Sequence, residues 1–297
     1  MRRLLDSAME GLPPFAYTRL GFNARRRLWG WDEPKPDSMD GKVVVVTGAT
    51  RGLGHAAAEA LSSAGATVET VGRSGGTRQG DIGDLDQVRA LAKELASAHK
   101  RIDVLIHNAG AIPPTRTITP QGLEAIWAMM VVGPHLLTKL LRDQLAGGRV
   151  IWMTSGGMYT QRLHLDDVGM AHEEYDGVRQ YARAKRAQVD LVHEYAQRGL
   201  PFTSLAAHPG WAATQGVEES LPTFNKVMGP VLRSADQGSD TVVWLAATDE
   251  PLRDGGLYFD RRLRSDRRLP NTSTSAADRA RLWALVESQV TDDDAGQ

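Results

Sequence analysis

The stretch from Lys42 to Gly54, KVVVVTGATRGLG, constrains the fold more than any other part of the chain. Its four consecutive valines form a run too short for a helix and predict a strand that is buried on both faces, as in a parallel sheet. Gly48, Gly52 and Gly54 follow at once, and a segment of helical composition then runs to Gly65. A strand, a glycine turn and a helix together direct backbone N–H groups at a pyrophosphate, because a Cβ would block the approach. We therefore predict a dinucleotide-binding unit here, with an ordinary strand-to-helix turn as the alternative.

The composition of the chain removes several other functions. The 297 residues include no cysteine, which excludes disulfides, thiolate nucleophiles and cysteine-ligated metals, and we predict no metal site. A net charge of -1 gives no reason to expect a nucleic acid partner. No apolar run reaches the roughly 18 residues that a membrane span needs, and no signal peptide is recognisable. We expect a cytoplasmic protein.

The first 40 residues differ in composition from the rest, because arginines alternate with aromatic side chains. One interpretation is a basic amphipathic segment that rests peripherally on a membrane or on a partner. The other is an arm whose aromatic side chains pack on the domain while its arginines stay solvated. We therefore divide the chain into an N-terminal arm over residues 1–40 and one domain over residues 41–297. The aromatic residues of the arm are Phe15, Tyr17, Phe22, Trp29 and Trp31.

The end of the second predicted strand, Ala66 to Val71, indicates which cofactor is preferred. An acidic residue at this point would bind a ribose 2′-hydroxyl, but Arg73 follows the strand and Arg51 lies in the glycine loop. Two guanidinium groups favour the 2′-phosphate of NADP(H), with NAD(H) as the other cofactor and two solvent-facing arginines as the alternative interpretation.

The connection to the next element is unusually short, since only GGTRQG separates Ser74 from Asp81. A crossover between parallel strands normally needs a dozen or more residues. Either the helix is missing and a glycine-rich loop replaces it, or the third strand is reached directly.

The remaining pattern alternates helices and strands and predicts an α/β fold, a Rossmann-like doubly wound parallel sheet. Polar, Pro- and Gly-containing residues at about 211–233 have the composition of a substrate lid. The apolar residues of this lid are Trp211, Leu221, Phe224, Val227 and Met228. We expect helices over Asp84–Ala98, Pro120–Leu145, Gln180 onward, Ala235–Ala247 and Ala276–Gln289. The second of these should kink at Gly133–Pro134. We expect strands over Asp103–His107, Arg149–Thr154, Phe202–Ala207 and Gly256–Phe259.

Five short motifs occur in an order that resembles the short-chain dehydrogenases/reductases over nearly the whole chain. They are the glycine loop, Asn108-Ala109-Gly110, the strand-tip Ser155, Tyr181-x-x-x-Lys185 and Pro209-Gly210. Longer segments are similar to the branch of this family called dehydrogenase/reductase SDR family member 12-like, which also has an N-terminal arm. These segments are TSGGMYTQRL, YDGVRQYARAKRAQV, HPGWAATQGV, RSADQGSDTVVWLA and FDRRLRSDRRLP.

The chemistry of hydride transfer explains why Tyr181, Lys185 and Ser155 matter. Tyr181 and Lys185 are four residues apart and share one helix face. A tyrosine with a pKa of about 10 needs a nearby cation to exchange protons near neutral pH. The resemblance implies Tyr181 as general acid/base, Lys185 as its electrostatic partner and ribose ligand, and Ser155 as donor to the substrate oxygen. An ordinary helix pair and a turn cap are the alternatives.

The resemblance also implies a set of cofactor contacts and an activity: an NADP(H)-dependent oxidoreductase acting on a small apolar alcohol or carbonyl. Where the family has a fourth catalytic residue, an asparagine, this chain has Met130, and we expect main-chain carbonyls at the kink to hold the water that asparagine would steady. The alternative function is a dinucleotide-binding sensor or scaffold with little turnover. A homodimer through the two central helices is common in the family. The implied cofactor contacts are Gly48, Thr50, Arg51, Gly52, Leu53, Gly54, Arg73, Asp81, Ile82, Asn108, Ala109, Gly110, Tyr181, Lys185, Pro209, Gly210 and Thr214.

Overall fold

A single eight-stranded sheet forms the centre of the molecule. The computed structural model describes residues 1–32, 35–213, 226, 228–267, 269 and 272–291. The strand order is β3-β2-β1-β4-β5-β6-β7-β8, and every pairing is parallel except that of β7 with β8. The predicted Rossmann-like sheet is therefore confirmed. The strands are β1 (Val43–Thr47), β2 (Thr67–Gly72), β3 (Arg78–Gln79), β4 (Val104–His107), β5 (Arg149–Met153), β6 (Thr203–His208), β7 (Leu257–Phe259) and β8 (Arg262–Arg264).

The valine run forms the central strand β1 because both of its faces are covered. Val44 and Val46 belong to the hydrophobic cluster on one side of the sheet, and Val45 belongs to the cluster on the other side. All three side chains are 0% exposed. Side chains alternate between the faces of a strand, so a continuous apolar run requires a helical layer on each face.

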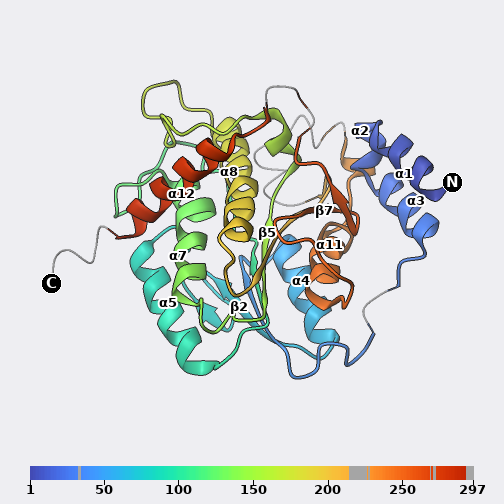
Figure 1. The fold of residues 1–297 in the computed structure, drawn as a ribbon, viewed down its shortest axis with the longest axis horizontal. Coiled ribbons are helices and arrows are strands. Elements are labelled where there is room, and N and C mark those ends of the chain that lie inside the picture. Colours follow the sequence, from blue (N-terminus) through green and yellow to red (C-terminus); the bar gives the residue numbers. More distant parts are fainter. Residues whose placement is uncertain (33–34, 214–225, 227, 268, 270–271, 292–297) are drawn as a thin grey trace.

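Helices form those two layers (Figure 1). On one face lie α4 (Gly52–Ser63) and α11 (Ala235–Ala247), and on the other lie α5 (Leu85–Ala98), α7 (Gly133–Leu140) and α8 (Gly177–Gln197). The C-terminal helix α12 (Ala276–Thr291) crosses over α7 and α8, where Trp283 packs edge-on against Tyr195 and His135. The predicted kink in the segment before α7 is a π-helix, Ala128–Val132, which follows α6 (Ala125–Trp127); residues 120–124 are not helical.

The short connection from β2 to β3 contains no helix and leads directly into the third strand. Thr70 and Thr77 exchange two hydrogen bonds across the loop, of 3.0 and 2.9 Å, from each main-chain N to the other residue's hydroxyl oxygen. Gly76 has a φ of +100°, which an L side chain rarely adopts. The loop thus brings the chain back beside β2 within a few residues. A glycine-rich loop replaces the helix and the third strand is reached directly, so the two features that we expected as alternatives occur together.

The hairpin from β7 to β8 is absent from our sequence-based expectation. Asp260 and Arg261 form its turn with φ values of 52° and 54°, the backbone of a two-residue hairpin loop. The usual sequence signal for such a turn is Asn-Gly or Asp-Gly, which this segment lacks. The Asp260 carboxylate instead binds Arg25 and Arg233, both of which are far from it in the sequence.

The N-terminal arm folds into three short helices that pack beside β7 and α11 (Figure 1). They are α1 (Arg2–Glu10), α2 (Pro13–Ala16) and α3 (Arg19–Trp29). The aromatic side chains Tyr17 and Phe22 are buried, as one of our two interpretations expected. The expectation that the arginines stay solvated is wrong for Arg25, which is 0% exposed because two carboxylates, Asp6 and Asp260, bind it. Among the described residues, no helix has both the length and the apolarity needed to cross a membrane.

Candidate active site

The glycine loop connects β1 to α4 at the carboxyl end of the sheet. Gly48 and Gly52 have φ values of +66° and +59°, where a Cβ is strained. A Cβ on Gly48 would also lie 2.7 Å from the Cα of Ala109, and one on Gly54 would collide with the carbonyl oxygen of Gly48. No side chain caps the first turn of α4, in contrast to α5, α8 and α11, which Asp84, Asp176 and Ser234 cap. The N–H groups at the start of α4 are therefore available to an anion.

Asn108 holds this loop against the end of β4. Its Nδ2 donates to the carbonyl oxygens of Thr47 and Gly48, at 3.1 and 3.0 Å. The main-chain N–H groups of Asn108 and Ala109 donate to the hydroxyl of Thr47, at 3.1 and 3.2 Å. The Asn108–Gly110 turn thus fixes the end of β1, at the point where strand order reverses and α/β sheets bind ligands.

The two arginines expected near a 2′-phosphate lie at the ends of the first two strands and are exposed. Arg73 Nη1 lies 4.0 Å from Asp81 Oδ2, and Asp81 Oδ1 accepts a hydrogen bond of 2.8 Å from the N–H of Gly83. Ile82 is buried, and its carbonyl oxygen lies where a Cβ on Gly133 would be, so the start of α7 closely approaches the connection between β3 and α5. A Cβ on Gly72 would collide with Thr50, which places that threonine beside the second strand. Leu53 packs against Gly238 of α11.

Ser155, Tyr181 and Lys185 come together at the carboxyl end of β5. Ser155 caps the 3₁₀-helix Gly156–Thr160, and its hydroxyl oxygen accepts a hydrogen bond of 3.4 Å from the N–H of Gly157. The Ser155 hydroxyl lies near enough to the Tyr181 hydroxyl to lower its pKa. The Lys185 ammonium lies 5.4 Å from the centre of the Tyr181 ring and donates to the carbonyl oxygen of Met153 at 2.7 Å.

Burial shifts the pKa of both titrating groups in this cluster. Loss of water raises the pKa of Tyr181, and the nearby Ser155 hydroxyl acts in the opposite direction. Burial lowers the pKa of Lys185 to about 7. Without a bound anion, the lysine therefore exchanges its proton near neutral pH, the range in which a proton relay is useful.

The Met130 position is supported by Gln188, which the sequence did not lead us to consider. Pro134 has no N–H, so the carbonyl of Met130 lacks its ordinary helical donor four residues on. The amide Nε2 of Gln188 donates to that carbonyl at 2.7 Å, so the carbonyl that we expected to hold a water already has one donor. A Cβ on Gly110 would lie 2.7 Å from Met130 Cε and 3.9 Å from Lys185 Nζ, so the methionine methyl group lies close to the lysine.

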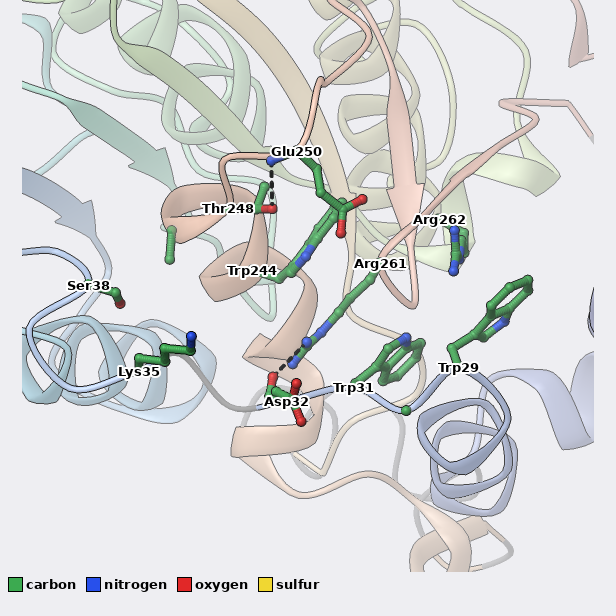
Figure 2. A pocket seen from close by; sticks show the side chains of 12 residues that line it. Trp29, Trp31, Asp32, Lys35, Ser38, Trp244, Thr248, Glu250, Arg261 and Arg262 are labelled. Carbon is green, nitrogen blue, oxygen red and sulfur yellow. Dashed lines mark hydrogen bonds between the residues drawn. The ribbon is translucent and has the colours of Figure 1, made fainter.

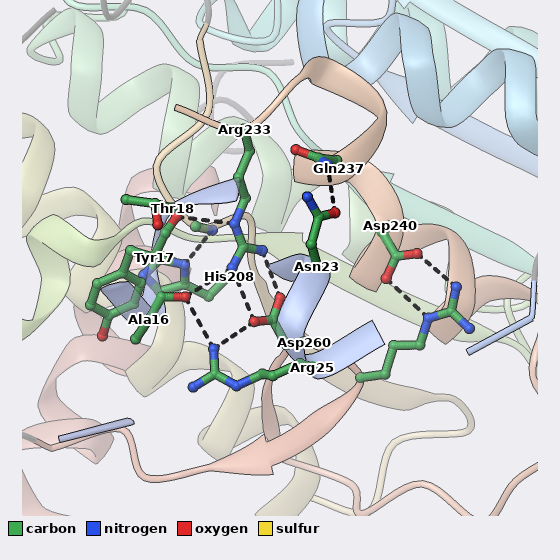
Figure 3. Close-up of polar contacts among 12 residues, drawn as sticks. Ala16, Tyr17, Thr18, Asn23, Arg25, His208, Arg233, Gln237, Asp240 and Asp260 are labelled. Carbon is green, nitrogen blue, oxygen red and sulfur yellow. Dashed lines mark hydrogen bonds and ion pairs between the residues drawn. The ribbon is translucent and has the colours of Figure 1, made fainter. Parts of the chain in front are cut away.

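The Pro209–Gly210 turn lies between the cluster and the N-terminal arm. Gly210 has a φ of +76°, and a Cβ there would collide with Arg233. His208 Nδ1 accepts a hydrogen bond of 2.8 Å from the N–H of Gly210. Next along the chain, the N–H of Trp211 donates to the carbonyl oxygen of Tyr17 at 2.8 Å. Arg233 Nε donates to the same carbonyl at 3.0 Å (Figure 3). Sequence reasoning missed this contribution of the arm because no local pattern connects residue 17 with residue 211.

Most predicted site residues therefore lie along one edge of the sheet, with Arg51 and Arg73 at one end and Pro209 and Gly210 at the other. The expected contact of Thr214, and most of the expected lid at 211–233, lie outside the described residues. A separate cavity of about 330 Å³ lies between the arm and α11, and none of the predicted site residues lines it (Figure 2). Trp29, Trp31, Trp244, Arg261 and Arg262 are among the residues that line it.

Comparison with known proteins agrees with this geometry. The family model described as short chain dehydrogenase matches residues 42–222. A Streptomyces protein assigned as a daunorubicin C-13 ketoreductase is 35% identical over 274 residues, which cover 86% of this chain and 94% of the relative. Dehydrogenase/reductase SDR family member 12 of Bos taurus is 33% identical over 298 residues, 91% of this chain and 93% of the relative.

A solved structure of an uncharacterised protein from Mycobacterium paratuberculosis superimposes with a TM-score of 0.70 at 28% identity, covering 88% of this chain and 97% of that one. The family model matches more than half of the chain, and its relatives are similar over nearly their full length. These comparisons indicate the same family as the glycine loop, the Asn108 turn and the Ser155 cluster. This chain belongs to the short-chain dehydrogenase/reductase family of oxidoreductases.

Proposed function

We propose that this chain is an NADP(H)-dependent oxidoreductase that transfers a hydride between nicotinamide and an apolar alcohol or carbonyl compound. The observation that supports it most is the cluster of Ser155, Tyr181 and Lys185 at the carboxyl end of the sheet. The uncapped start of α4 and the glycine loop fit the pyrophosphate of a dinucleotide, because they offer main-chain N–H groups without side chains in front of them.

The residues of the cluster divide the proton chemistry among them. The bound nicotinamide supplies or accepts the hydride. In the reductive direction Tyr181 gives its phenolic proton to the oxygen of the reduced carbonyl, and Ser155 donates a hydrogen bond to the same oxygen. Lys185 favours the resulting phenolate by its charge. In the oxidative direction each proton moves the other way.

Arg51 and Arg73 support the preference for NADP(H) over NAD(H). Both are exposed, Arg51 in the loop after β1 and Arg73 directly after β2, and Asp81 binds Arg73 only at 4.0 Å. A 2′-phosphate gives a guanidinium group a stronger, bidentate partner than that distant carboxylate. We expect Arg73→Ala to weaken NADPH binding about tenfold and to leave NADH binding within twofold, as measured by titration of each cofactor. Equal losses for the two cofactors would contradict the preference.

Met130 need not prevent turnover, because Gln188 supports the π-helix that Pro134 creates. The Gln188 amide donates to the Met130 carbonyl, and Gln188 Oε1 has no hydrogen-bond partner within the described part of the chain. Gln188 lies three residues after Lys185 on the same helix face. We propose that this oxygen accepts from the water that an asparagine would steady. Met130→Asn should then change kcat by less than tenfold, and a gain of several orders of magnitude would show that the native chain is nearly inert.

The second candidate function, a dinucleotide sensor or scaffold, is favoured by Met130 and by the short connection from β2 to β3. A sensor needs cofactor binding but no proton transfer, so it keeps its biological effect when Tyr181 is replaced. The direct test is a thermal-shift comparison of NAD(H) with NADP(H), followed by a panel of carbonyl substrates with the preferred cofactor. Oxidation of NADPH by at least one carbonyl compound in this panel supports the enzyme. Cofactor binding without turnover of any member supports the sensor.

Two further partners are proposals. For a peripheral membrane contact, α1 and the two residues after it expose Leu4, Leu5 and Leu12 (76%, 51% and 61%) beside Arg2 and Arg3. Co-sedimentation with anionic liposomes, compared with a Leu4→Ser/Leu5→Ser variant, tests it.

For the homodimer, the family's usual helix pair corresponds to α7 and α8, which α12 covers here. Dimerisation through those helices would have to displace α12, so we expect light scattering to find a monomer. A dimer that buries α7 and α8 would contradict this expectation.

A further inference from the structure

Five aromatic rings lie together between the N-terminal arm and the turn after Ser155, and we call them the aromatic wall. The Tyr17 ring stacks on the His208 ring with 5.0 Å between centroids and 17° between planes. The Trp211 ring lies 5.5 Å from that of Tyr17, and the Phe259 ring lies 4.9 Å from that of His208. The members of the aromatic wall are Tyr17, Tyr159, His208, Trp211 and Phe259.

The aromatic wall adjoins the residue that follows the candidate catalytic serine. A Cβ on Gly156 would lie 3.2 Å from His208 Nε2 and 3.7 Å from Trp211 Nε1. Because Gly156 has no side chain, the rings of His208 and Trp211 approach the main chain next to Ser155, where the proposed function places the substrate carbonyl. The other four rings are buried, whereas Trp211 is partly exposed. Trp211 is therefore the ring that a bound molecule can contact.

The arm fixes Trp211 through main-chain contacts. The carbonyl oxygen of Tyr17 accepts from the N–H of Trp211 at 2.8 Å and from Arg233 Nε at 3.0 Å. The N–H of Arg233 donates to the carbonyl oxygen of Trp211 at 2.8 Å, which closes the arrangement. Trp211 thus has its N–H and its C=O bound to two different segments.

Buried ion pairs hold the arm in the same position. Arg25 donates to Asp6 at 2.8 Å, to Asp260 at 2.7 Å and to the carbonyl oxygen of Ala16 at 3.0 Å. Arg233 donates to the other oxygen of Asp260 at 2.6 Å. These charges are fully buried, so they keep their places only while both partners are present. The carbonyl of Tyr17, one residue after Ala16, is positioned by this network.

We propose that the arm-held aromatic wall selects carbonyl substrates in which a planar aromatic ring adjoins the carbonyl, with that ring packed against Trp211. The inference rests on the proposed function, because it places the carbonyl oxygen at Ser155 and Tyr181. Aromatic pairs in stacked or edge arrangements gain energy beyond the area they bury, and a saturated ring of similar size does not. A preformed wall also loses little freedom when the ligand binds. The N-terminal arm then determines substrate specificity without touching the reacting atoms.

The test compares kcat/KM for acetophenone and for cyclohexyl methyl ketone, which differ in whether the ring is aromatic. Their intrinsic reactivities differ, but by the same factor in every variant, so the change in their ratio isolates the wall. We expect Trp211→Leu to lower the ratio of acetophenone to cyclohexyl methyl ketone about fivefold. The matched control is Trp244→Leu, a tryptophan outside the wall, which should leave the ratio within twofold.

A second pair of variants tests the arm. Arg25→Lys keeps a buried charge but cannot serve Asp6, Asp260 and Ala16 together, so it should lower the ratio as Trp211→Leu does. Arg27→Lys is the control, because Arg27 lies on the exposed face of the same helix and should leave the ratio within twofold. Trp211 is partly exposed, so its variant tests the wall even if Arg25→Lys fails to fold.

The outcomes separate the two levels of the proposal. An unchanged ratio in Trp211→Leu would overturn the aromatic preference while leaving the reductase intact. If the ratio falls in Trp211→Leu but is unchanged in folded Arg25→Lys, the N-terminal arm does not determine the substrate specificity. If the native chain bound NADPH but reduced neither ketone nor any other carbonyl compound, the proposed function itself would fail.

Discussion

The cofactor side and the substrate side of the candidate site are built in different ways. On the cofactor side, short segments at the ends of β1 and β4 meet through main-chain groups, and glycines allow the approach. On the substrate side, charged and aromatic side chains bring together residues that are far apart in the sequence, such as Arg25 and Asp260, which are separated by 235 positions. The first is encoded in contiguous motifs and the second in long-range pairs. Substitutions should therefore affect the two sides through different quantities.

The largest effect is expected at the point where both sides meet. Tyr181→Phe removes the proton donor but keeps the ring beside Lys185, so we expect kcat to fall about 10³-fold, within the usual range for general acid/base catalysis. The Kd for NADPH should stay within threefold. Steady-state kinetics and cofactor titration measure the two. Retention of more than a tenth of the activity would remove Tyr181 from the chemistry.

The substrate side should depend on its buried charges for stability. Arg25→Met removes one of the two arginines that bind Asp6 and one of the two that bind Asp260, and we expect it to lower the free energy of unfolding by about 3 kcal/mol. Arg27→Met, on the exposed face of the same helix, should change it by less than about 0.5 kcal/mol. Urea unfolding measures both. A similar small cost for the two variants would mean that the network does not hold the arm.

The cofactor side should instead respond to added atoms. Gly48→Ala combines a positive φ with a collision with Ala109, and we expect a loss of about 2–4 kcal/mol in stability together with weaker NADPH binding. Gly199→Ala is the matched control, because its φ of +58° is similar but nothing lies within 4 Å of its Cβ position. It should cost about 1 kcal/mol and leave cofactor binding unchanged. Equal effects would mean that close approach plays no part.

The cofactor-free protein should show the buried lysine in its pH dependence. The pKa of Lys185 is lowered from 10.5 to about 7 in the folded chain. Between these values the unfolded chain binds the extra proton, so stability should rise with pH from about 7 toward 10, by at most about 1.4 kcal/mol per pH unit. Thermal unfolding of the native chain relative to Lys185→Met should show this rise. A difference independent of pH would contradict the shift.

The smallest effect is expected beside the π-helix. Gln188→Leu removes the hydrogen bond to the Met130 carbonyl and also the oxygen that we propose holds a water. We expect kcat to fall about fivefold, as for the loss of one hydrogen bond. The pH profile of kcat should shift as well, because Lys185 loses its route for proton exchange. A lower stability with an unchanged pH profile would show that Gln188 is purely structural.

Sequence patterns predicted the sheet and most of the helices because those elements follow local rules. The Val43–Thr47 strand, the capped helix after Asp84 and the helix Ala235–Ala247 are where hydrophobic period and capping residues predicted them. The β8 strand was missed because its turn depends on Asp260 binding two distant arginines rather than on a turn sequence. The Gln188 contact was missed because no spacing rule connects a helix residue to a carbonyl in another helix.

By itself, the sequence determined the parallel sheet, the glycine loop and the Tyr181–Lys185 pair, since each depends on residues within a few positions of one another. Only the tertiary structure decided that Arg25 is buried, that Tyr17 binds Trp211, and that α12 covers α7 and α8. The physical reason is that an arginine has the same intrinsic preferences in water and in a core. Whether it stays solvated depends on which carboxylates the completed fold brings within hydrogen-bond distance.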